Sequence, residues 1–386
     1  MMKTDWGLYV HIPFCQSKCY YCDFYSHLST ATVREQYGQA ILMHMREFFS
    51  QSSFDKTGPP ATLFLGGGTP SLMSPLFLRQ IMALLRTYFE IPQNFEVTIE
   101  ANPGTLTDAE MYQWVEQGCN RLSMGVQAFQ QSNLDFLGRN HTPEDVDKVV
   151  QSARHSGLTN ISFDFIYGIP GQTLEDWLFT LEKALQLKPK HLSLYNLKIE
   201  DHTVLAQKLS QGSFNLLSED EEVAMYEKAV ALLQEKGFQQ YELSNFALPG
   251  FECRHNINYW RRGDYLGFGS GAVSMKGLHR WTWIKDSRAY MEALQKGFQV
   301  PKAEEEQLSP IEGAEEVLFL GLRHQEGVDL QQLEREYEVP ADIMAFWKKI
   351  SREFSLQGWL DYKDHRITLR PASYLLSNEV MKRYLL

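Results

Sequence analysis

From residue 8 to about residue 240, short apolar runs rich in β-forming residues alternate with longer segments of helical periodicity. Strands that alternate with helices form right-handed βαβ units, which place the strands in one parallel sheet. The predicted strands are residues 8–14, 61–65, 95–100, 121–126, 161–167 and 191–197. The predicted helices are residues 32–50, 75–89, 107–116, 143–156, 173–187 and 218–236. The predicted fold class is therefore α/β, with a partial TIM-like (β/α)6 barrel.

Three predicted helices begin with a hydroxyl residue that is followed three positions later by an acid, which is the pattern of a capping box. These pairs are Thr107 and Glu110, Thr173 and Asp176, and Ser218 and Glu221. The acidic run at residues 219–222 is accordingly interpreted as a capped helix start on a solvated face, not as a metal site.

Three of the five cysteines form a C-x3-C-x2-C pattern directly after the first predicted strand, at Cys15, Cys19 and Cys22. Such short spacings suit a soft-metal site better than a disulfide. A structural zinc would need a fourth ligand, whereas an iron–sulfur cubane held by three thiolates keeps one iron open. The candidates for that fourth ligand are His11, Asp23 and His27. The cluster is the favoured interpretation, with zinc and buried, unliganded cysteines as alternatives; Cys119 is expected to be such a buried thiol.

Glycines and polar residues gather where the predicted strands end. Gly66, Gly67, Gly68 and Thr69 follow the second strand, where glycine allows a positive φ and a close approach of the backbone to a ligand. Since a tight turn explains glycines equally well, this run alone is a weak signal, and it lacks the lysine of a P-loop.

The polar residues of the later strand ends are Glu100, Gln127, Arg139 and Asp164. In parallel β/α folds, chemistry collects at the carboxyl ends of the strands. The alternatives are capped strand ends and a structural Arg139–Asp164 ion pair.

The cysteine pattern after a first strand resembles the radical S-adenosylmethionine (radical SAM) signature. The longer string from Tyr9 to Cys22 resembles the anaerobic coproporphyrinogen III oxidase superfamily and its HemW-type heme-chaperone branch. This resemblance implies a 4Fe–4S cluster on Cys15, Cys19 and Cys22, SAM on the open iron, and an electron donor for the cluster. The implied contacts to the first SAM are Tyr9, Gly67 and Glu100. Those to the second SAM of the oxidase branch are Tyr21, Gly68, Thr69, Gln127, Arg139 and Asp164.

A segment rich in aromatic, basic and glycine residues follows at 251–283 and is expected to form a loop surface. Its string His255-Asn-x-x-Tyr259-Trp260 resembles a motif of HemW-type proteins. Neutral imidazole and thiolate are both heme ligands, so the tentative heme contacts are His255, Cys253, Tyr259 and Trp260. Nearby arginines are candidates to pair with propionates. The alternative is that His255 bonds to the backbone and the arginines are solvated.

The predicted domain organisation has three parts: a barrel at residues 1–240, a loop-rich segment at 241–300, and a small C-terminal helical, winged-helix-like domain at 301–386 that begins with a linker at 301–310. Residues 317–386 carry ten Lys or Arg and ten Asp or Glu. With that balance and a net charge of −11 for the chain, binding to nucleic acid is not expected.

No apolar run approaches the ~18 residues of a membrane helix, and the first residues lack the apolar region of a signal peptide. Membrane insertion is therefore not expected. Five cysteines, an odd number, fit a reducing compartment, so the expected location is the cytoplasm.

Three functions remain open, the third being a radical SAM methyltransferase or a heme-opening relative on the same scaffold. The first is a heme chaperone that binds heme and delivers it to acceptor hemoproteins. The second is an oxygen-independent coproporphyrinogen III oxidase, which converts propionates to vinyls. Phe24 stands where the oxidase branch has a fourth cysteine, and only eight residues precede Tyr9 where that branch has an extension; both features favour the chaperone. Whether the protein is an enzyme stays undecided; any activity would be of the coproporphyrinogen dehydrogenase type.

Overall fold

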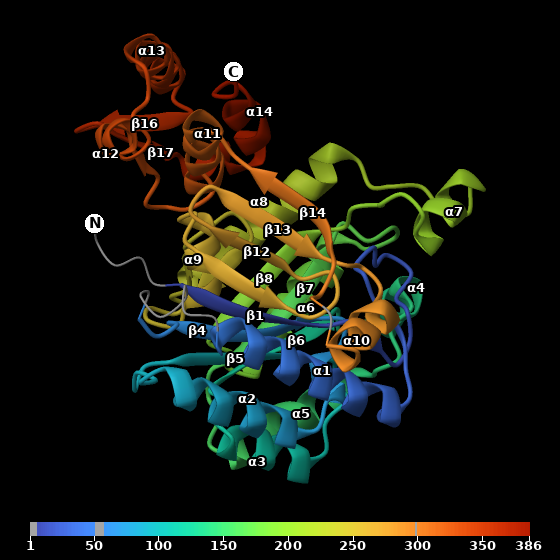
Figure 1. Ribbon diagram of the computed structural model, residues 1–386. Coiled ribbons are helices and arrows are strands. Elements are labelled where there is room, and N and C mark those ends of the chain that lie inside the picture. Colours follow the sequence, from blue (N-terminus) through green and yellow to red (C-terminus); the bar gives the residue numbers. More distant parts are fainter. Residues whose placement is uncertain (1–5, 51–57, 298) are drawn as a thin grey trace.

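A computed structural model describes residues 6–50, 58–297 and 299–386 (Figure 1). The expectation that the chain starts without a signal peptide concerns residues 1–5 and lies outside the described residues. The main body is a 12-stranded sheet with the order β14-β13-β12-β11-β1-β4-β5-β6-β7-β8-β10-β9. Its central strands curve into the partial barrel that the sequence predicts.

The six predicted barrel strands are confirmed, and they lie next to one another in parallel in chain order. They are β1 Gly7–Ile12, β4 Thr62–Gly67, β5 Glu96–Ala101, β6 Arg121–Gln127, β7 Ile161–Tyr167 and β8 His191–Asn196. Beyond β1 the chain forms a separate short strand, β2 Phe14–Cys15, which pairs with β3 His27–Leu28. This side sheet carries the first cysteine away from the barrel wall.

The predicted barrel helices are confirmed and lie along the outer side of the sheet (Figure 1). They are α1 Ala31–Ser50, α2 Pro75–Tyr88, α3 Asp108–Glu116, α5 Pro143–His155, α6 Leu174–Gln186 and α8 Glu219–Glu235. The three predicted capping boxes are present at Thr107, Thr173 and Ser218. Short helices that the sequence did not indicate are η1 Pro70–Leu72, α4 Gln131–Leu137 and α7 Val204–Ser210.

The inner face of the barrel sheet is polar, because alternate residues of a strand point to opposite faces. On β5, Val97 and Ile99 belong to the apolar core under the helices. The intervening positions carry polar groups that bond between neighbouring strands, as Ser123 Oγ does to Asp164 Oδ2 at 3.0 Å and Ser162 Oγ to His191 Nδ1 at 2.7 Å. A polar interior suits a barrel that holds charged ligands.

The segment at 241–300 is not the loop surface that the sequence predicts. It forms β10 Asn245–Ala247, α9 Arg254–Trp260, β11 Tyr265–Phe268, β12 Val273–Lys276, β13 His279–Trp283 and α10 Ser287–Gln295. Strand β11 extends the barrel by pairing in parallel with β1. Trp281 and Trp283 are each only 7% exposed, so they pack in the core instead of covering a ligand at the surface.

The polar run predicted as a linker is strand β14 Lys302–Gln307, which pairs with β13. Charge is compatible with an exposed edge strand, and every residue of β14 is exposed. The linker prediction was wrong here, while the division of the chain near residues 240 and 300 stays a prediction.

The C-terminal part is mainly helical, as predicted, with three α-helices followed by a hairpin and a last α-helix (Figure 1). Its elements are α11 Pro310–Gly321, β15 Val328–Asp329, α12 Leu330–Glu336, α13 Ala341–Leu356, β16 Leu360–Lys363, β17 Arg366–Leu369, η2 Pro371–Leu376 and α14 Ser377–Lys382. Strands β15, β17 and β16 form a separate small sheet beside these helices, as in a winged helix.

Candidate functional site

The three clustered cysteines lie on one partly exposed loop that leaves β2. Backbone bonds fix this loop to the glycine turn after β4, since Gly68 N donates to Ile12 O at 2.8 Å and Thr69 N donates to Phe14 O at 2.7 Å. Within the loop, Cys22 N donates to Cys19 O at 3.3 Å. The cysteine loop and the glycine turn are therefore one local unit.

Two of the three candidates for the fourth ligand of a zinc ion, His11 and His27, are engaged by other groups. Both ring nitrogens of His11 are engaged, with Tyr9 Oη at 3.0 Å and Tyr25 O at 3.1 Å. Those of His27 bond to Pro13 O at 2.9 Å and Ser287 Oγ at 2.8 Å.

Three thiols on one loop, with His11 and His27 engaged elsewhere, are the donor set of a site-differentiated iron–sulfur cluster. Burial raises the pKa of the Cys22 thiol, with Cys19 and Cys15 nearby adding to the effect. A Cβ atom on Gly68 would lie only 3.0 Å from Cys15 Sγ and 2.6 Å from Phe14 O, so this position must be glycine. Arg139 Nη1 donates to Cys19 Sγ at 3.4 Å and can stabilise a thiolate.

The residues expected to contact the first SAM come together: Gly67 and Glu100 lie at the carboxyl ends of β4 and β5, and Tyr9 reaches them from the middle of β1. Glu100 Oε2 accepts from Gly67 N at 3.0 Å. A Cβ on the adjacent Gly66 would lie 3.0 Å from the Tyr9 ring and 3.2 Å from Glu100 Oε2, so these side chains line one narrow site. Burial, helped by the charge of Asp164, raises the pKa of Glu100 to about 8. Such a carboxyl is prepared to pair with a cationic group.

The residues expected to contact a second SAM meet around Arg139, which is 9% exposed. Its Nη2 donates to Asn102 Oδ1 at 2.6 Å and to Gly125 O at 2.7 Å. Asn102 Nδ2 in turn donates to Thr69 Oγ1 at 3.0 Å. Gln127 has a φ of +67°, which is uncommon for a residue other than glycine.

Arg139 and Asp164 do not form an ion pair among the described residues, so the structural ion pair considered as an alternative is not observed. Asp164 accepts from Ser123 instead, and burial raises the pKa of its carboxyl. Burial also raises the pKa of the Tyr21 hydroxyl, while the neighbouring Arg139 opposes that shift. The polar residues at the strand ends thus form a network through Asn102, not a closed ion pair.

Asn102, which links Arg139 to Thr69, was not assigned a role from the sequence, and His11, a candidate zinc ligand there, instead bonds to Tyr9. Their signal was their place at the carboxyl end of a strand, as for Glu100. Cys119 is buried, and burial raises its thiol pKa to about 12, which confirms the expected inert thiol.

Helix α9, which carries the His-Asn-x-x-Tyr-Trp string, packs against the amino ends of the barrel strands. His255 is 1% exposed, and both of its ring nitrogens are engaged: Nδ1 with Thr62 Oγ1 at 2.7 Å and Nε2 with Tyr259 Oη at 2.9 Å. Its ring stacks on Phe64 with centroids 5.1 Å apart, and Tyr9 follows at 6.4 Å. In this arrangement His255 forms part of the barrel floor below Tyr9 and offers no free nitrogen to an iron.

The other tentative heme contacts are also enclosed. Cys253 is fully buried beside Glu96 Oε1 at 3.8 Å, and burial raises its thiol pKa to about 12. Trp260 packs under the guanidinium of Arg323, 5.1 Å from the ring centroid.

The arginines expected near propionates bind protein groups. Arg261 pairs with Glu326, while Arg262 and Arg280 both pair with Glu316. Arg254 Nη1 donates to Asn94 O at 2.6 Å. Arg262 is buried, whereas the Arg261 side chain is 57% exposed, so the solvated arginines of the alternative interpretation are observed only in part.

Comparison with known proteins agrees with this geometry. The family model of the radical SAM superfamily matches residues 9–184, and that of the HemN C-terminal domain matches residues 308–376. The fold resembles that of coproporphyrinogen III oxidase (HemN) from Escherichia coli, with a TM-score of 0.82 and 24% identity over 99% of this chain and 90% of that one. The fold and the three-cysteine site thus define a radical SAM protein with a HemN-type C-terminal domain.

The chain is 35% identical over 386 residues to the heme chaperone HemW of Lactococcus lactis, covering 100% of this chain and 99% of the relative. It is 33% identical to heme chaperone HemW of Bacillus subtilis, covering 98% of each chain. The chain belongs to this HemW family. Membership of the radical SAM superfamily implies a 4Fe–4S cluster and SAM. No helix of the described residues is both long and apolar enough to cross a membrane.

Proposed function

We propose that the protein is a heme chaperone, which binds heme and delivers it to acceptor hemoproteins from a scaffold that carries a 4Fe–4S cluster and SAM. The observation that carries this proposal is the match to heme chaperones HemW along the whole chain, from the cysteine loop to the C-terminal domain. Phe24 supports it, because this side chain is 64% exposed where the oxidase branch has its fourth cysteine.

In this proposal Cys15, Cys19 and Cys22 hold the cluster, whose open iron binds SAM and makes reductive chemistry available. Tyr9 and the backbone of Gly67 fix the first SAM, and Glu100 pairs with a cationic group of that ligand. Arg139 positions Cys19 through the 3.4 Å hydrogen bond to its Sγ.

A second SAM would contact Tyr21, Gly68, Thr69, Gln127, Arg139 and Asp164. Support for this site comes from the Asn102 bonds that join Arg139 to Thr69. Its occupancy is part of the proposal, as are an external electron donor for the cluster and a cytoplasmic location.

Heme contact by His255, Cys253, Tyr259 and Trp260 also stays a proposal. The iron can reach His255 Nε2 only after the 2.9 Å bond to Tyr259 breaks and α9 moves from the barrel floor. A heme site outside this helix needs no such movement.

The second candidate is oxygen-independent coproporphyrinogen III oxidase. The observation in its favour is that the residues resembling the SAM contacts of that branch lie together in the barrel, on a fold like that of HemN. In this candidate, Cys15, Cys19 and Cys22 would hold the cluster, and Tyr9, Gly67 and Glu100 would hold the SAM that supplies radical chemistry. Each propionate would lose one hydrogen atom, CO2 and one electron, which passes to an external acceptor, and would become a vinyl group.

Anaerobic reconstitution followed by two parallel assays separates the candidates. One assay titrates heme, follows the Soret band, and then measures transfer to an apo-hemoprotein. The other supplies coproporphyrinogen III with SAM and a reductant and measures decarboxylated tetrapyrrole and 5′-deoxyadenosine. We expect a perturbed Soret band with transfer, and no decarboxylated product. An unperturbed Soret band would reject the chaperone, and stoichiometric vinyl formation would establish the oxidase.

A further inference from the structure

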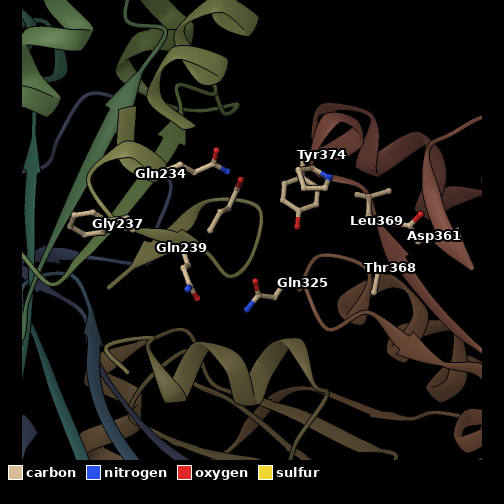
Figure 2. Close-up of a pocket in the computed structure, with 11 residues that line it drawn as sticks. Gln234, Gly237, Gln239, Gln325, Asp361, Thr368, Leu369 and Tyr374 are labelled. Carbon is tan, nitrogen blue, oxygen red and sulfur yellow. The ribbon is translucent and has the colours of Figure 1, made fainter. Parts of the chain in front are cut away.

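A groove of about 560 Å³ lies between the barrel part and the C-terminal domain (Figure 2). One wall is the end of α8 with β9 Gln239–Gln240, and the other is β16, β17 and the start of η2. The polar residues that line it include Gln234, Gln239, Gln325, Asp361, Thr368 and Tyr374. None of the cysteines or proposed SAM contacts belongs to this lining, so the groove is separate from the site in the barrel.

The groove offers hydrogen bonds without net charge. The side-chain amides of Gln234, Gln239 and Gln325 surround it (Figure 2), and none of them bonds to another described residue. Asp361 is the one carboxylate of the lining, and its Oδ1 accepts from Arg370 Nη2 at 2.7 Å and Nε at 2.9 Å. Free amides both donate and accept, which matches a peptide backbone better than an ion.

The wall at β9 is an open sheet edge. Strand β9 is the last strand of the large sheet and pairs on one side with β10. On the other side of β9, the C-terminal domain pairs only with the two residues after this strand. Gln325 N donates to Tyr241 O at 3.0 Å, and His324 forms an antiparallel bridge with Glu242. No described strand pairs with Gln239 and Gln240 on this side. The groove lies along this unpaired part of β9.

The opposite wall is shaped to cover an added strand. Asp361 and Thr368 are register partners on β16 and β17, so their side chains leave the same face of the small sheet. Leu369, Pro371 and the ring of Tyr374 add apolar surface beside them. A groove of this volume lies within the range of ~300–1,000 Å³ that is usual for binding sites.

We propose that this groove binds an extended, uncharged peptide segment of a partner protein, which adds a strand to the free edge of β9. Main-chain hydrogen bonds supply the affinity in this mode of recognition, and neighbouring pockets select the side chains. The glutamine amides bind polar groups of the segment, and Thr368 and Tyr374 cover its other face. An anion would find no free cation in the lining, and a cation would find only a carboxylate already paired with arginine.

The test uses the full chain and fluorescence anisotropy with a blocked, labelled octapeptide, Thr-Val-Thr-Gln-Thr-Val-Thr-Gln. Gln239→Arg and Thr368→Arg fill the groove from opposite walls, and unfolding transitions check that both variants fold. Gln113→Arg on α3 is the matched control, because Gln113 is exposed and lies outside the groove lining. We expect saturable binding that each groove variant weakens at least tenfold and the control leaves unchanged.

Two further versions of the octapeptide carry N-methyl groups at alternate residues. One version is methylated at the odd positions and the other at the even positions, so each blocks the N–H groups along one edge of the extended peptide. We expect at least one of them to lose binding, because strand addition needs backbone N–H groups on one edge. The proposal is overturned by an absence of saturable binding at millimolar peptide or by equal binding to the groove variants and the control. Undiminished binding of both methylated peptides, or binding only of versions with Glu or Lys in place of Gln, overturns it as well.

Discussion

At the scale of single residues, Gly67 joins the cysteine loop to the proposed SAM site. Its φ of +114° lies in the region that favours glycine, and its N–H donates to Glu100. A Cβ at this position would lie 2.6 Å from Cε1 of His11, a ring held in place by Tyr9 and Tyr25. Glycine is therefore required at position 67 for two reasons: the backbone has a positive φ, and there is no space for a Cβ atom.

Gly67→Ala is expected to lower the free energy of unfolding by about 3 kcal/mol and to weaken SAM binding at least tenfold, since strain of ~1–2 kcal/mol adds to a clash. Denaturant titration and equilibrium dialysis with SAM, both anaerobic, measure these effects. Gly118→Ala is the control: its φ is +108°, but a Cβ there meets nothing within 4 Å. Equal effects of the two substitutions would show that only backbone strain matters.

At the scale of elements, α9 explains why the aromatic string is buried. Its first backbone N–H groups are satisfied by Glu96, which accepts from Arg254 N and His255 N at 3.1 Å each. Since Glu96 belongs to β5 and Thr62 to β4, both bonds fix the helix to the barrel floor. The stack of His255, Phe64 and Tyr9 then connects this floor with the proposed SAM site.

Tyr259→Phe removes the hydroxyl that occupies His255 Nε2 and tests whether this nitrogen serves as a heme ligand. We expect the free energy of unfolding to fall by about 1–2 kcal/mol, because a buried ring nitrogen loses its partner. Under the proposed heme contact, the freed Nε2 is expected to change the heme spectrum and to tighten heme binding in this variant, and the change should be absent in Tyr259→Phe combined with His255→Ala. An unchanged heme spectrum would show that His255 only supports the barrel floor.

At the scale of the whole molecule, one carboxylate joins the extended sheet to the C-terminal domain. Glu316 on α11 accepts from Arg262 Nε at 2.8 Å and from Arg280 Nη2 at 2.7 Å. The Arg262 side chain is only 3% exposed. Nearby, the pair of Arg261 and Glu326 bridges the same parts but is more than half exposed on both sides.

Glu316→Gln is expected to destabilise the protein by about 3 kcal/mol, because it leaves a buried guanidinium without its counter-charge. Glu326→Gln is the matched control, because it breaks the exposed pair with Arg261. This substitution should lower the free energy of unfolding by less than about 1 kcal/mol. Chemical denaturation followed by tryptophan fluorescence compares the two. A loss in Glu316→Gln no larger than in Glu326→Gln would mean that apolar packing alone holds the domain.

Local spacing in the sequence was enough to predict the six central strands, their helices, the capping boxes and the three-cysteine loop. Each depends on residues close in the chain, such as Thr107 and Glu110, or on the alternation of strands and helices that makes a sheet parallel. Glu100 and Gln127 could be placed at one end of the barrel for the same reason, whereas Asp164 lies in the middle of β7.

Only the tertiary structure decided what the segment after the barrel does. A seven-residue helix such as α9 is too short to form by itself, and its burial depends on Glu96 and Thr62, which lie more than 150 residues earlier in the sequence. Likewise, the arginines seemed free to bind propionates until the fold brought Glu316 and Glu326 beside them. The cysteine spacing determined which cofactor the chain can hold, whereas long-range pairing determined which histidine, arginines and sheet edge remain available for other ligands.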